Sequence, residues 1–184
     1  MNWLDELEKI APPPAAERRG PVPSPEDWAA AEQALGLRIP GDYKAFVARY
    51  GSDGAFAEEF SCYSPVSAYQ ALSLPRATEG QAWAYSEMQS SSPRRFPMPL
   101  FPAPGGFFAI GVSGNGDYFG WIVGAGAPET WRAAWLGDEE GEADVYDMSL
   151  TQWLVAFVQG RIRGKAMWVP PPEDLPMRFF GPRT

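Results

Sequence analysis

EQALGLRIPGDYKAFVARYG (residues 32–51) places two helical patterns on either side of the corner Leu-Arg-Ile-Pro-Gly-Asp. The first helix is predicted to begin at Ser24, whose hydroxyl can cap free amides, with Pro25 in the first helical position and Asp27 three residues after the cap. Gly36 suits the left-handed residue that ends a helix. The apolar face of this helix comprises Trp28, Ala31 and Leu35.

The second helix follows the corner. Ile39 precedes Pro40 and is therefore biased toward an extended conformation, and Asp42 is a candidate N-cap. The apolar stripe of this helix comprises Tyr43, Phe46, Val47 and Tyr50, and Gly51 ends it. We expect two short amphipathic helices that press against one apolar surface.

The composition indicates one folded domain with appended ends. At 184 residues the chain has the usual length of a single domain. Hydrophobic residues make up 45% of it and eight residues are Trp, so the apolar area suffices for a core. The 20 Pro and 19 Gly residues indicate many loops or extended segments.

The charge and the residue types exclude several function classes. A formal net charge of −8 without a basic patch argues against nucleic-acid binding, because phosphates are neutralised by clustered Lys and Arg. Such a charge suits either a basic protein partner or simply a solvated surface. The absence of histidine removes the usual general base, and the single Cys62 excludes an internal disulfide and multi-cysteine metal sites. We therefore expect no metal, no cofactor and no enzymatic activity.

Membrane and targeting segments are not expected. The sequence has no run of about eighteen apolar residues. Its first residues, MNWLDELEKI, are acidic where a signal peptide would be basic. The expected compartment is the cytoplasm.

The chain divides at its proline-rich stretches into three predicted segments, residues 1–25, 26–162 and 163–184. Residues 2–10 have the pattern of a short helix, and the following APPPAAERRGPVPSP cannot continue it. This helix is expected to dock either on the domain or on a partner. The end of the chain, VPPPEDLPMRFFGPRT, is predicted to be extended, with its aromatic residues packed on the domain.

The middle of the chain is predicted to supply a mostly antiparallel sheet. FFAIGVSGNGDYFGWIV (residues 107–123) has two apolar runs around Ser-Gly-Asn-Gly-Asp, which is a hairpin signal. Further strands are predicted at 54–63, 130–136 and 143–148, and weaker helical patterns at 65–72 and 78–88. A last helix is predicted to begin at the cap Ser149, with Gln152 completing a capping box. Its buried stripe comprises Leu150, Trp153, Leu154, Phe157 and Val158, and Gly160 ends it.

Two polar motifs are candidate sites. Residues 111–116 have the glycines of a phosphate loop but lack the Gly-Lys-Ser/Thr ending and lead into a strand, which favours a tight hairpin. GDEEGEAD (residues 137–144) contains five carboxylates without a nearby counter-charge in the sequence and does not match the EF-hand pattern. It is interpreted either as a solvated turn or as an anionic patch for a basic protein. The candidate partner-binding residues are Asp117, Asp138, Glu139, Glu140, Glu142 and Asp144.

Four stretches, in order, carry a resemblance to a known family: EDWAAAEQALGLRIPGDYKAFVARYG, FFAIGVSGNGDYFGWIV, APETWRAAW and VYDMSLTQWLVAFVQGRI. From Glu26 to about Ile162 the chain resembles the SUKH superfamily, which comprises bacterial immunity proteins and also fungal cell-wall-synthesis regulators. The resemblance implies an α+β fold, with a twisted, mostly antiparallel sheet and helices packed mainly on one side. It also implies that the two-helix corner is scaffold and leaves another surface free for a partner.

The resemblance further implies a binding function. Bacterial members of the superfamily typically neutralise polymorphic toxins, often nucleases or other nucleic-acid-modifying enzymes, by direct association. The leading hypothesis is therefore an immunity protein that occludes the active cleft of a cognate toxin, with acidic residues in place of phosphates. A regulatory or scaffold protein of the same fold and a carboxylate-based enzyme are the alternatives.

Overall fold

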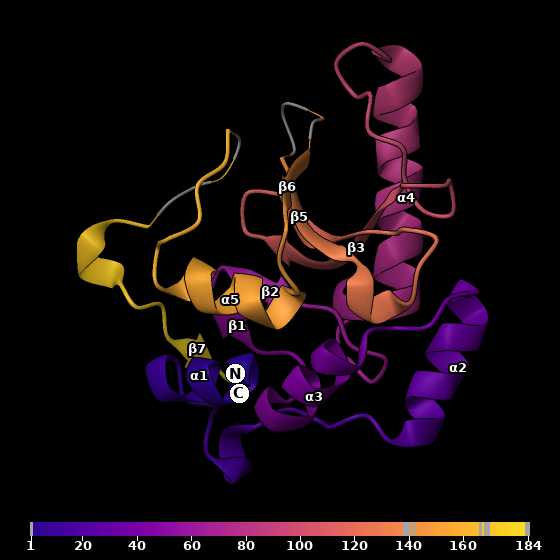
Figure 1. Ribbon diagram of the computed structural model, residues 1–184. Helices are drawn as coiled ribbons and strands as arrows, with labels where there is room; N and C mark the ends of the chain where they lie inside the picture. Colours follow the sequence, from indigo (N-terminus) through magenta and orange to yellow (C-terminus); the bar gives the residue numbers. More distant parts are fainter. Residues whose placement is uncertain (1, 138–140, 142, 166, 168–169, 183–184) are drawn as a thin grey trace.

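The elements of the chain follow the order shown in Figure 1. The computed structural model describes residues 2–137, 141, 143–165, 167 and 170–182. The α-helices are α1 (Trp3–Ile10), α2 (Pro25–Leu35), α3 (Gly41–Tyr50), α4 (Leu74–Ser91) and α5 (Leu150–Val158). The strands are β1 (Ala55–Phe56), β2 (Phe60–Cys62), β3 (Phe107–Ser113), β4 (Tyr118–Ile122), β5 (Arg132–Leu136), β6 (Ala143–Tyr146) and β7 (Phe179–Phe180). Short 3-10 helices are η1 (Ala16–Arg18), η2 (Gln70–Leu72), η3 (Pro128–Thr130) and η4 (Pro172–Asp174).

Within the described residues the strands form one seven-stranded sheet in the order β6-β5-β4-β3-β2-β1-β7. Each neighbouring pair in this order is antiparallel. The prediction of an α+β fold with a mostly antiparallel sheet is therefore confirmed. The last strand, β7, returns to the sheet beside β1, so the end of the chain extends the sheet.

The sheet curves strongly around one face. Gly111 in β3 lies under the ring of Phe119 in β4, since a Cβ at this glycine would come within 2.0 Å of the ring. The glycine thus lets an aromatic side chain lie flat across a neighbouring strand. Two strands, β3 and β4, separate β2 from β5 in the sheet, yet the ring centroids of Phe60 in β2 and Trp135 in β5 are only 5.9 Å apart. This face of the sheet is therefore concave.

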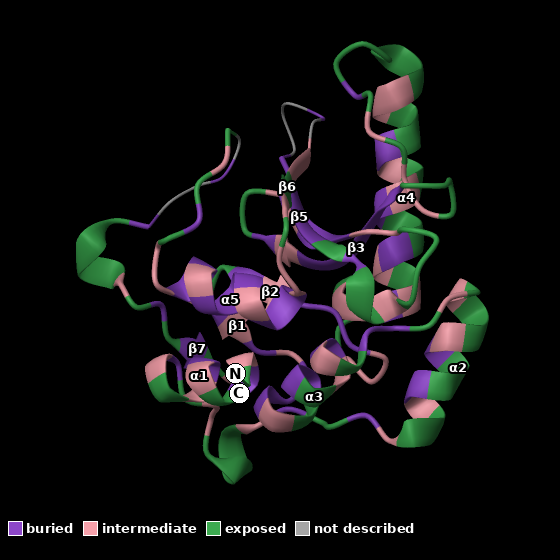
Figure 2. Cartoon of the chain, viewed as in Figure 1, coloured by how far each residue is buried: buried purple, intermediate pink, exposed green. Residues whose placement is uncertain are grey.

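Helix α5 fills the concave face with aromatic side chains. The rings of Trp153 and Phe157 stack at 4.7 Å between centroids, and Phe157 meets Phe60 edge-on at 4.8 Å. Trp153, Leu154 and Phe157 are all buried, which confirms the predicted stripe. Figure 2 shows the buried residues concentrated on the strands and on the inward sides of the helices. Helices α1 and α3 pack beside α5. Helix α4 contacts β3 and lies on the opposite side of β3 from α5 (Figure 1).

The two-helix corner forms as the sequence predicts. Ser24 and Asp27 make a complete capping box at the start of α2, with bonds of 3.1 Å from the Asp27 N–H to the Ser24 hydroxyl and 2.8 Å from the Ser24 N–H to the Asp27 carboxylate. Gly36 ends α2 in the left-handed conformation. Of the predicted core residues of the corner, Trp28, Ile39, Tyr43 and Phe46 are buried and Leu35 is partly buried.

The side chain of Glu32 holds the corner closed. Its Oε1 accepts a hydrogen bond of 2.8 Å from the Ile39 N–H and lies 2.5 Å from Lys44 Nζ. One carboxylate of α2 therefore reaches both the turn and α3. Tyr43 then fastens α3 to the sheet, because its hydroxyl donates to the carbonyl oxygen of Tyr63 at 2.5 Å.

The prediction that Asp42 caps its own helix is wrong. Pro40 occupies the N-cap position of α3, and no side-chain bond caps that end. Asp42 lies inside the helix, and its Oδ2 instead accepts bonds from Thr151, the second residue of α5. Ser149, the predicted cap of α5, accepts a bond of 3.3 Å from the Gln152 N–H.

Two predicted elements between the corner and the long hairpin differ in the structure. Residues 54–63 form the hairpin β1–β2, where one strand was predicted. Residues 65–72 contain only η2, where a helix was predicted, because Asp53 holds the preceding loop in another conformation. The Asp53 carboxylate accepts bonds from the Ala68 N–H, at 3.0 Å, and from the Ser67 hydroxyl. The pattern at 78–88 belongs to the longer helix α4.

Both proline-rich ends lie on the domain. Leu4, Leu7 and Ala11 are buried, and the Tyr50 hydroxyl donates a bond of 2.7 Å to the Ala11 carbonyl oxygen. Gly20 passes so close to the backbone of Ser52 that a Cβ there would lie 1.9 Å from its carbonyl oxygen. The predicted division into residues 1–25, 26–162 and 163–184 stays a prediction.

Candidate partner-binding surface

The acidic stretch at residues 137–144 begins after β5 and includes the first two residues of β6. Of the predicted site residues, Asp138, Glu139, Glu140 and Glu142 lie outside the described residues. Asp144 is half-buried, and its carboxylate lies against Gly164, where a Cβ would come 2.0 Å from Asp144 Oδ2. A Cβ at Gly141 would lie 2.2 Å from the carbonyl oxygen of Arg95. Chain segments far away in sequence therefore border the acidic stretch, which no local pattern indicates.

Asp117 is built into the turn between β3 and β4. It is only 8% exposed, and its Oδ2 accepts a bond of 3.1 Å from the Ser113 hydroxyl. The same hydroxyl accepts a bond of 3.1 Å from the Asp117 N–H. The Asp117 carboxylate therefore shapes the turn from inside, and Gly114 and Asn115 are exposed at the tip.

The strand register brings two turns and the end of β5 to one end of the sheet. Phe60 pairs with Ser113, which places the β1–β2 turn beside the β3–β4 turn. Tyr118 pairs with Leu136 across β4 and β5, so the β5–β6 connection begins at the same end. We call this end, comprising the turns at residues 57–59 and 113–117 and the end of β5 at residues 136–137, the turn end of the sheet.

Glu58 and Glu59 also lie at the turn end, and the sequence pattern does not predict them as site residues. Both are exposed, and the carboxylate of Glu59 lies beside Gly114, where a Cβ would come 2.0 Å from Glu59 Oε2. The sequence pattern predicts one continuous strand at residues 54–63, so no turn is expected at these two glutamates. The available signal was an acidic pair between Phe56 and Phe60, since two adjacent carboxylates are unusual inside a strand that is half buried.

The β1–β2 turn has an unfavourable backbone conformation. Ala57 and Glu58 have φ angles of 51° and 60°, a backbone region that residues other than glycine and asparagine rarely adopt. The Glu59 N–H donates a bond of 3.0 Å to the Phe56 carbonyl oxygen, which closes a tight turn with two left-handed residues. The Ala57 N–H donates a bond of 2.8 Å to the Arg178 carbonyl oxygen, so the C-terminal segment holds this turn in place.

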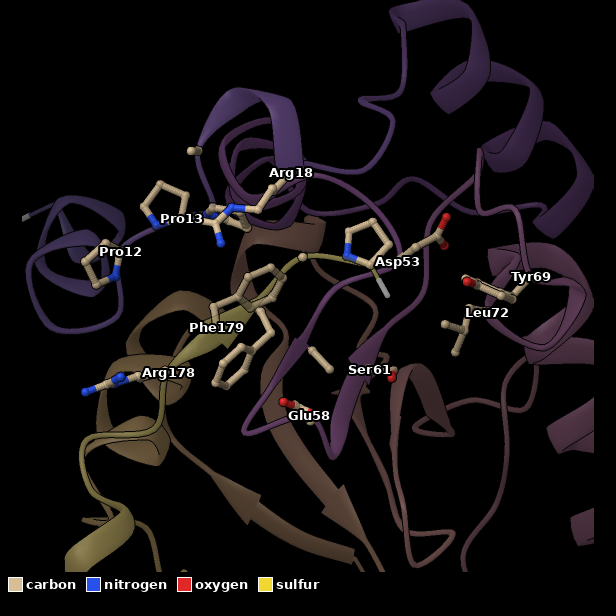
Figure 3. Close-up of a pocket in the computed structure, with 16 residues that line it drawn as sticks. Pro12, Pro13, Arg18, Asp53, Glu58, Ser61, Tyr69, Leu72, Arg178 and Phe179 are labelled. Carbon is tan, nitrogen blue, oxygen red and sulfur yellow. The ribbon is translucent and has the colours of Figure 1, made fainter. Parts of the chain in front are cut away.

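A cleft of about 800 Å³ lies between the two ends of the chain and the edge of the sheet. Figure 3 shows Pro12 and Pro13 on one side of it and Tyr69 and Leu72 on the opposite side. Phe179 and Phe180 of β7 also line it. Its wall therefore combines proline and aromatic side chains with charged ones, among them Arg18, Asp53 and Arg178.

A second hollow of about 1000 Å³ adjoins the first along β7. The two share the lining residues Pro12, Glu58, Arg178, Phe179 and Phe180. We call the two hollows together the edge groove. It begins at the β1–β2 turn and therefore meets the turn end of the sheet.

The fold places the thiol of Cys62 in the core. Cys62 is 6% exposed, and burial raises the pKa of its thiol to about 12, so the reactive thiolate is scarce at neutral pH. Within the described part of the chain no three His, Cys, Asp or Glu side chains are grouped to hold a metal ion. None of the helices described here is long and apolar enough to cross a membrane.

Comparison with known proteins gives one family. No curated protein sequence matches the chain. Residues 23–156 match the family model described as SMI1 / KNR4 family (SUKH-1), which covers more than half of the 184 residues. This range contains the two-helix corner, β1 to β6 and most of α5, and it confirms the resemblance to the SUKH superfamily. The chain therefore belongs to the SMI1/KNR4 family (SUKH-1).

Proposed function

We propose that this protein is an immunity protein that binds a cognate protein toxin and neutralises it by covering the active cleft of the toxin. The family supports a protein of the SUKH type, and proteins of this type are often immunity proteins. The proposed toxin is a nuclease or another enzyme that modifies nucleic acids, and the cytoplasm is the proposed place of encounter. The protein itself is proposed to have no catalytic activity.

The observation that carries the proposal is the strand pairing that places Glu58, Glu59 and Asp117 at the end of the sheet where β5 also ends. The proposed contact surface comprises Asp117, Asp138, Glu139, Glu140, Glu142 and Asp144, with Glu58 and Glu59 added from the structure. A cleft that binds nucleic acid is lined by Lys and Arg, so an acidic surface complements it. Asp117 would act by holding the turn that presents Asn115.

The binding proposal is tested by growth protection. The chain, carrying an affinity tag, is used to capture toxins from its host, and captured proteins are identified by mass spectrometry. Each captured toxin is then expressed in a sensitive bacterium with and without the chain. The proposal is supported if the cells grow only when the chain is present in at least an equimolar amount to the toxin. Growth inhibition that persists with a bound, well-folded chain contradicts it and favours a regulatory or scaffold role.

The contact surface is tested separately with charge variants. Converting Glu139, Glu140 and Glu142 together to Gln is expected to slow association with the captured toxin at low salt. The difference in association rate between the variant and the unchanged chain is expected to shrink at high salt, because exposed charges are screened within about 8 Å at physiological ionic strength. The matched control converts Glu26, Glu79 and Glu87, which are exposed on α2 and α4, to Gln. Equal slowing by both triple variants would move the interface away from the turn end.

A further inference from the structure

The edge groove combines an apolar floor with an acidic rim. Its second hollow is lined by the apolar residues Ile10, Pro12, Ala57, Leu175, Phe179 and Phe180. Phe180 is 41% exposed, which is high for an aromatic side chain of a strand. A partly exposed aromatic ring beside prolines is a suitable anchor for an apolar side chain of another protein.

The rim of this hollow is strongly one-sided in charge. Glu58 and Glu59 approach from the β1–β2 turn, and Glu173 and Asp174 approach from η4. All four are exposed. Among the described residues that line the hollow, Arg178 is the only basic one. The rim therefore repels acidic ligands and attracts basic ones.

The size of the groove suits a length of polypeptide. Each hollow is near the upper limit for a small-ligand pocket, roughly 300–1,000 Å³, and the two adjoin along β7. An extended segment fits this shape because its side chains alternate in direction, and can thus meet an apolar floor and a charged rim in turn.

We propose that the edge groove binds an extended segment of a partner protein in which Lys or Arg residues alternate with large apolar residues. The apolar side chains contact Phe180 and the prolines, and the basic side chains meet the four carboxylates of the rim. The inference rests on the proposed function in one respect, since it takes the chain to be a protein-binding module.

Much of this groove lies outside the residues that define the family. The family match covers residues 23–156, whereas Ile10, Pro12 and residues 170–180 come from the two proline-rich ends. The ends therefore add a binding surface to the shared domain. A partner that uses this surface is selected by features of this chain that other family members need not have.

The test uses the full chain and three synthetic peptides labelled with fluorescein. The first has the sequence Lys-Leu-Lys-Trp-Lys-Leu-Lys, the second has Glu in place of Lys, and the third has Ser in place of Leu and Trp. Fluorescence anisotropy at low salt gives the affinities, and amide NMR shifts locate the bound peptide. The Lys-Leu-Trp peptide is expected to bind, to shift the amides of residues 57–59 and 179–181, and to bind more tightly than either other peptide.

Two variants separate the groove from general charge attraction. E59Q/E173Q is expected to weaken binding of the first peptide about tenfold at low salt. The control E26Q/E87Q removes the same charge from exposed sites on α2 and α4 and is expected to leave the affinity within about twofold. F180A is expected to weaken binding about fivefold through its lost apolar contact.

Three outcomes overturn the inference: no binding of the first peptide, equal weakening by both double variants, or amide shifts away from the groove. None of them bears on toxin neutralisation, because the peptides are used without a toxin. Conversely, a chain that binds the first peptide in the groove and fails to protect cells would contradict the proposed function alone.

Discussion

Asp42 in α3 accepts two hydrogen bonds from Thr151 in α5, one of 3.2 Å from the backbone N–H and one of 3.0 Å from the hydroxyl. The two residues are 109 positions apart in the chain. The carboxylate satisfies a free amide in the first turn of α5 and places a negative charge where the helix dipole favours one. One side chain thus joins the two-helix corner to the helix that fills the concave face of the sheet.

Replacing Asp42 by Ala is expected to lower the free energy of unfolding by about 1–2 kcal/mol, because the Thr151 N–H loses its partner. Asp42→Asn keeps an acceptor oxygen and is expected to cost less. Urea unfolding followed by tryptophan fluorescence measures both. Glu79→Ala, on the exposed face of α4, is the control and is expected to change little. An equal decrease in the free energy of unfolding for Asp42→Ala and for the control would show that the Asp42 carboxylate does not stabilise the start of α5.

Replacing Trp153 or Phe157 by Ala is expected to destabilise the fold by roughly 3–5 kcal/mol, through lost burial and the cavity left behind. Both rings are buried and stack on one another, so removing either one also removes ring contacts of the other. Denaturant unfolding gives the change. Gln152→Ala, on the same helix, is the matched control. A loss below 1 kcal/mol for either ring would show that the concave face repacks easily.

The Cys62 thiol is expected to resist alkylation in the folded chain. Burial raises its pKa to about 12, so at pH 8 the thiolate fraction is roughly one in ten thousand. Raising the pH toward 12 increases this fraction, provided that the fold survives. Iodoacetamide labelling followed by mass measurement is the assay, with urea-unfolded chain as the control. Rapid labelling of folded protein at pH 8 would contradict the buried environment.

The β1–β2 turn is expected to gain stability from the double substitution Ala57→Asn and Glu58→Gly. Both positions have positive φ, and Asn-Gly is the favoured pair for a turn with two left-handed residues. The expected gain is roughly 1 kcal/mol, or a rise in Tm of about 2–4 °C for a chain of this size. Calorimetry measures it. Ala57→Val, which is β-branched, is expected to lower Tm, and a rise with Val would contradict the strained conformation.

The parts of the fold that the sequence predicted have local signals. The capping box of Ser24, the left-handed Gly36 and the apolar stripe around Trp153 each depend on residues within one or two turns of a helix. The β3–β4 hairpin is likewise predicted by the residues of its own turn. Such patterns determine where elements begin and which face is buried, but not which element each face meets.

The parts that the sequence missed depend on contacts between distant segments. Asp42 reads as a cap for the nearest helix, and only tertiary packing gives it Thr151 as donor. The β1–β2 hairpin was missed because Ala57 and Glu58 lack the residue types of a left-handed turn, and the bond to the Arg178 carbonyl helps to hold them there. Pairing of β7 with β1 leaves no local pattern at all.

The sequence indicates an acidic candidate surface but not all of the residues that the fold places beside it. The acidic stretch at residues 137–144 stands out by composition, whereas only the strand register places Glu58 and Glu59 at the end of the sheet where β5 ends. Asp117 also shows the limit of composition, because the Ser113 hydroxyl draws its carboxylate into the turn. Four of the predicted residues lie outside the described part of the chain, and their role stays a prediction.

The position of β7 has a consequence for how the protein is made. Phe56 leaves the ribosome long before Phe179, so the outer edge of β1 has no strand beside it during most of synthesis. An unpaired edge next to aromatic residues is a template for pairing with another nascent chain. Chains interrupted before residue 179 should therefore aggregate on crowded polysomes, and completed chains close that edge with their own last strand.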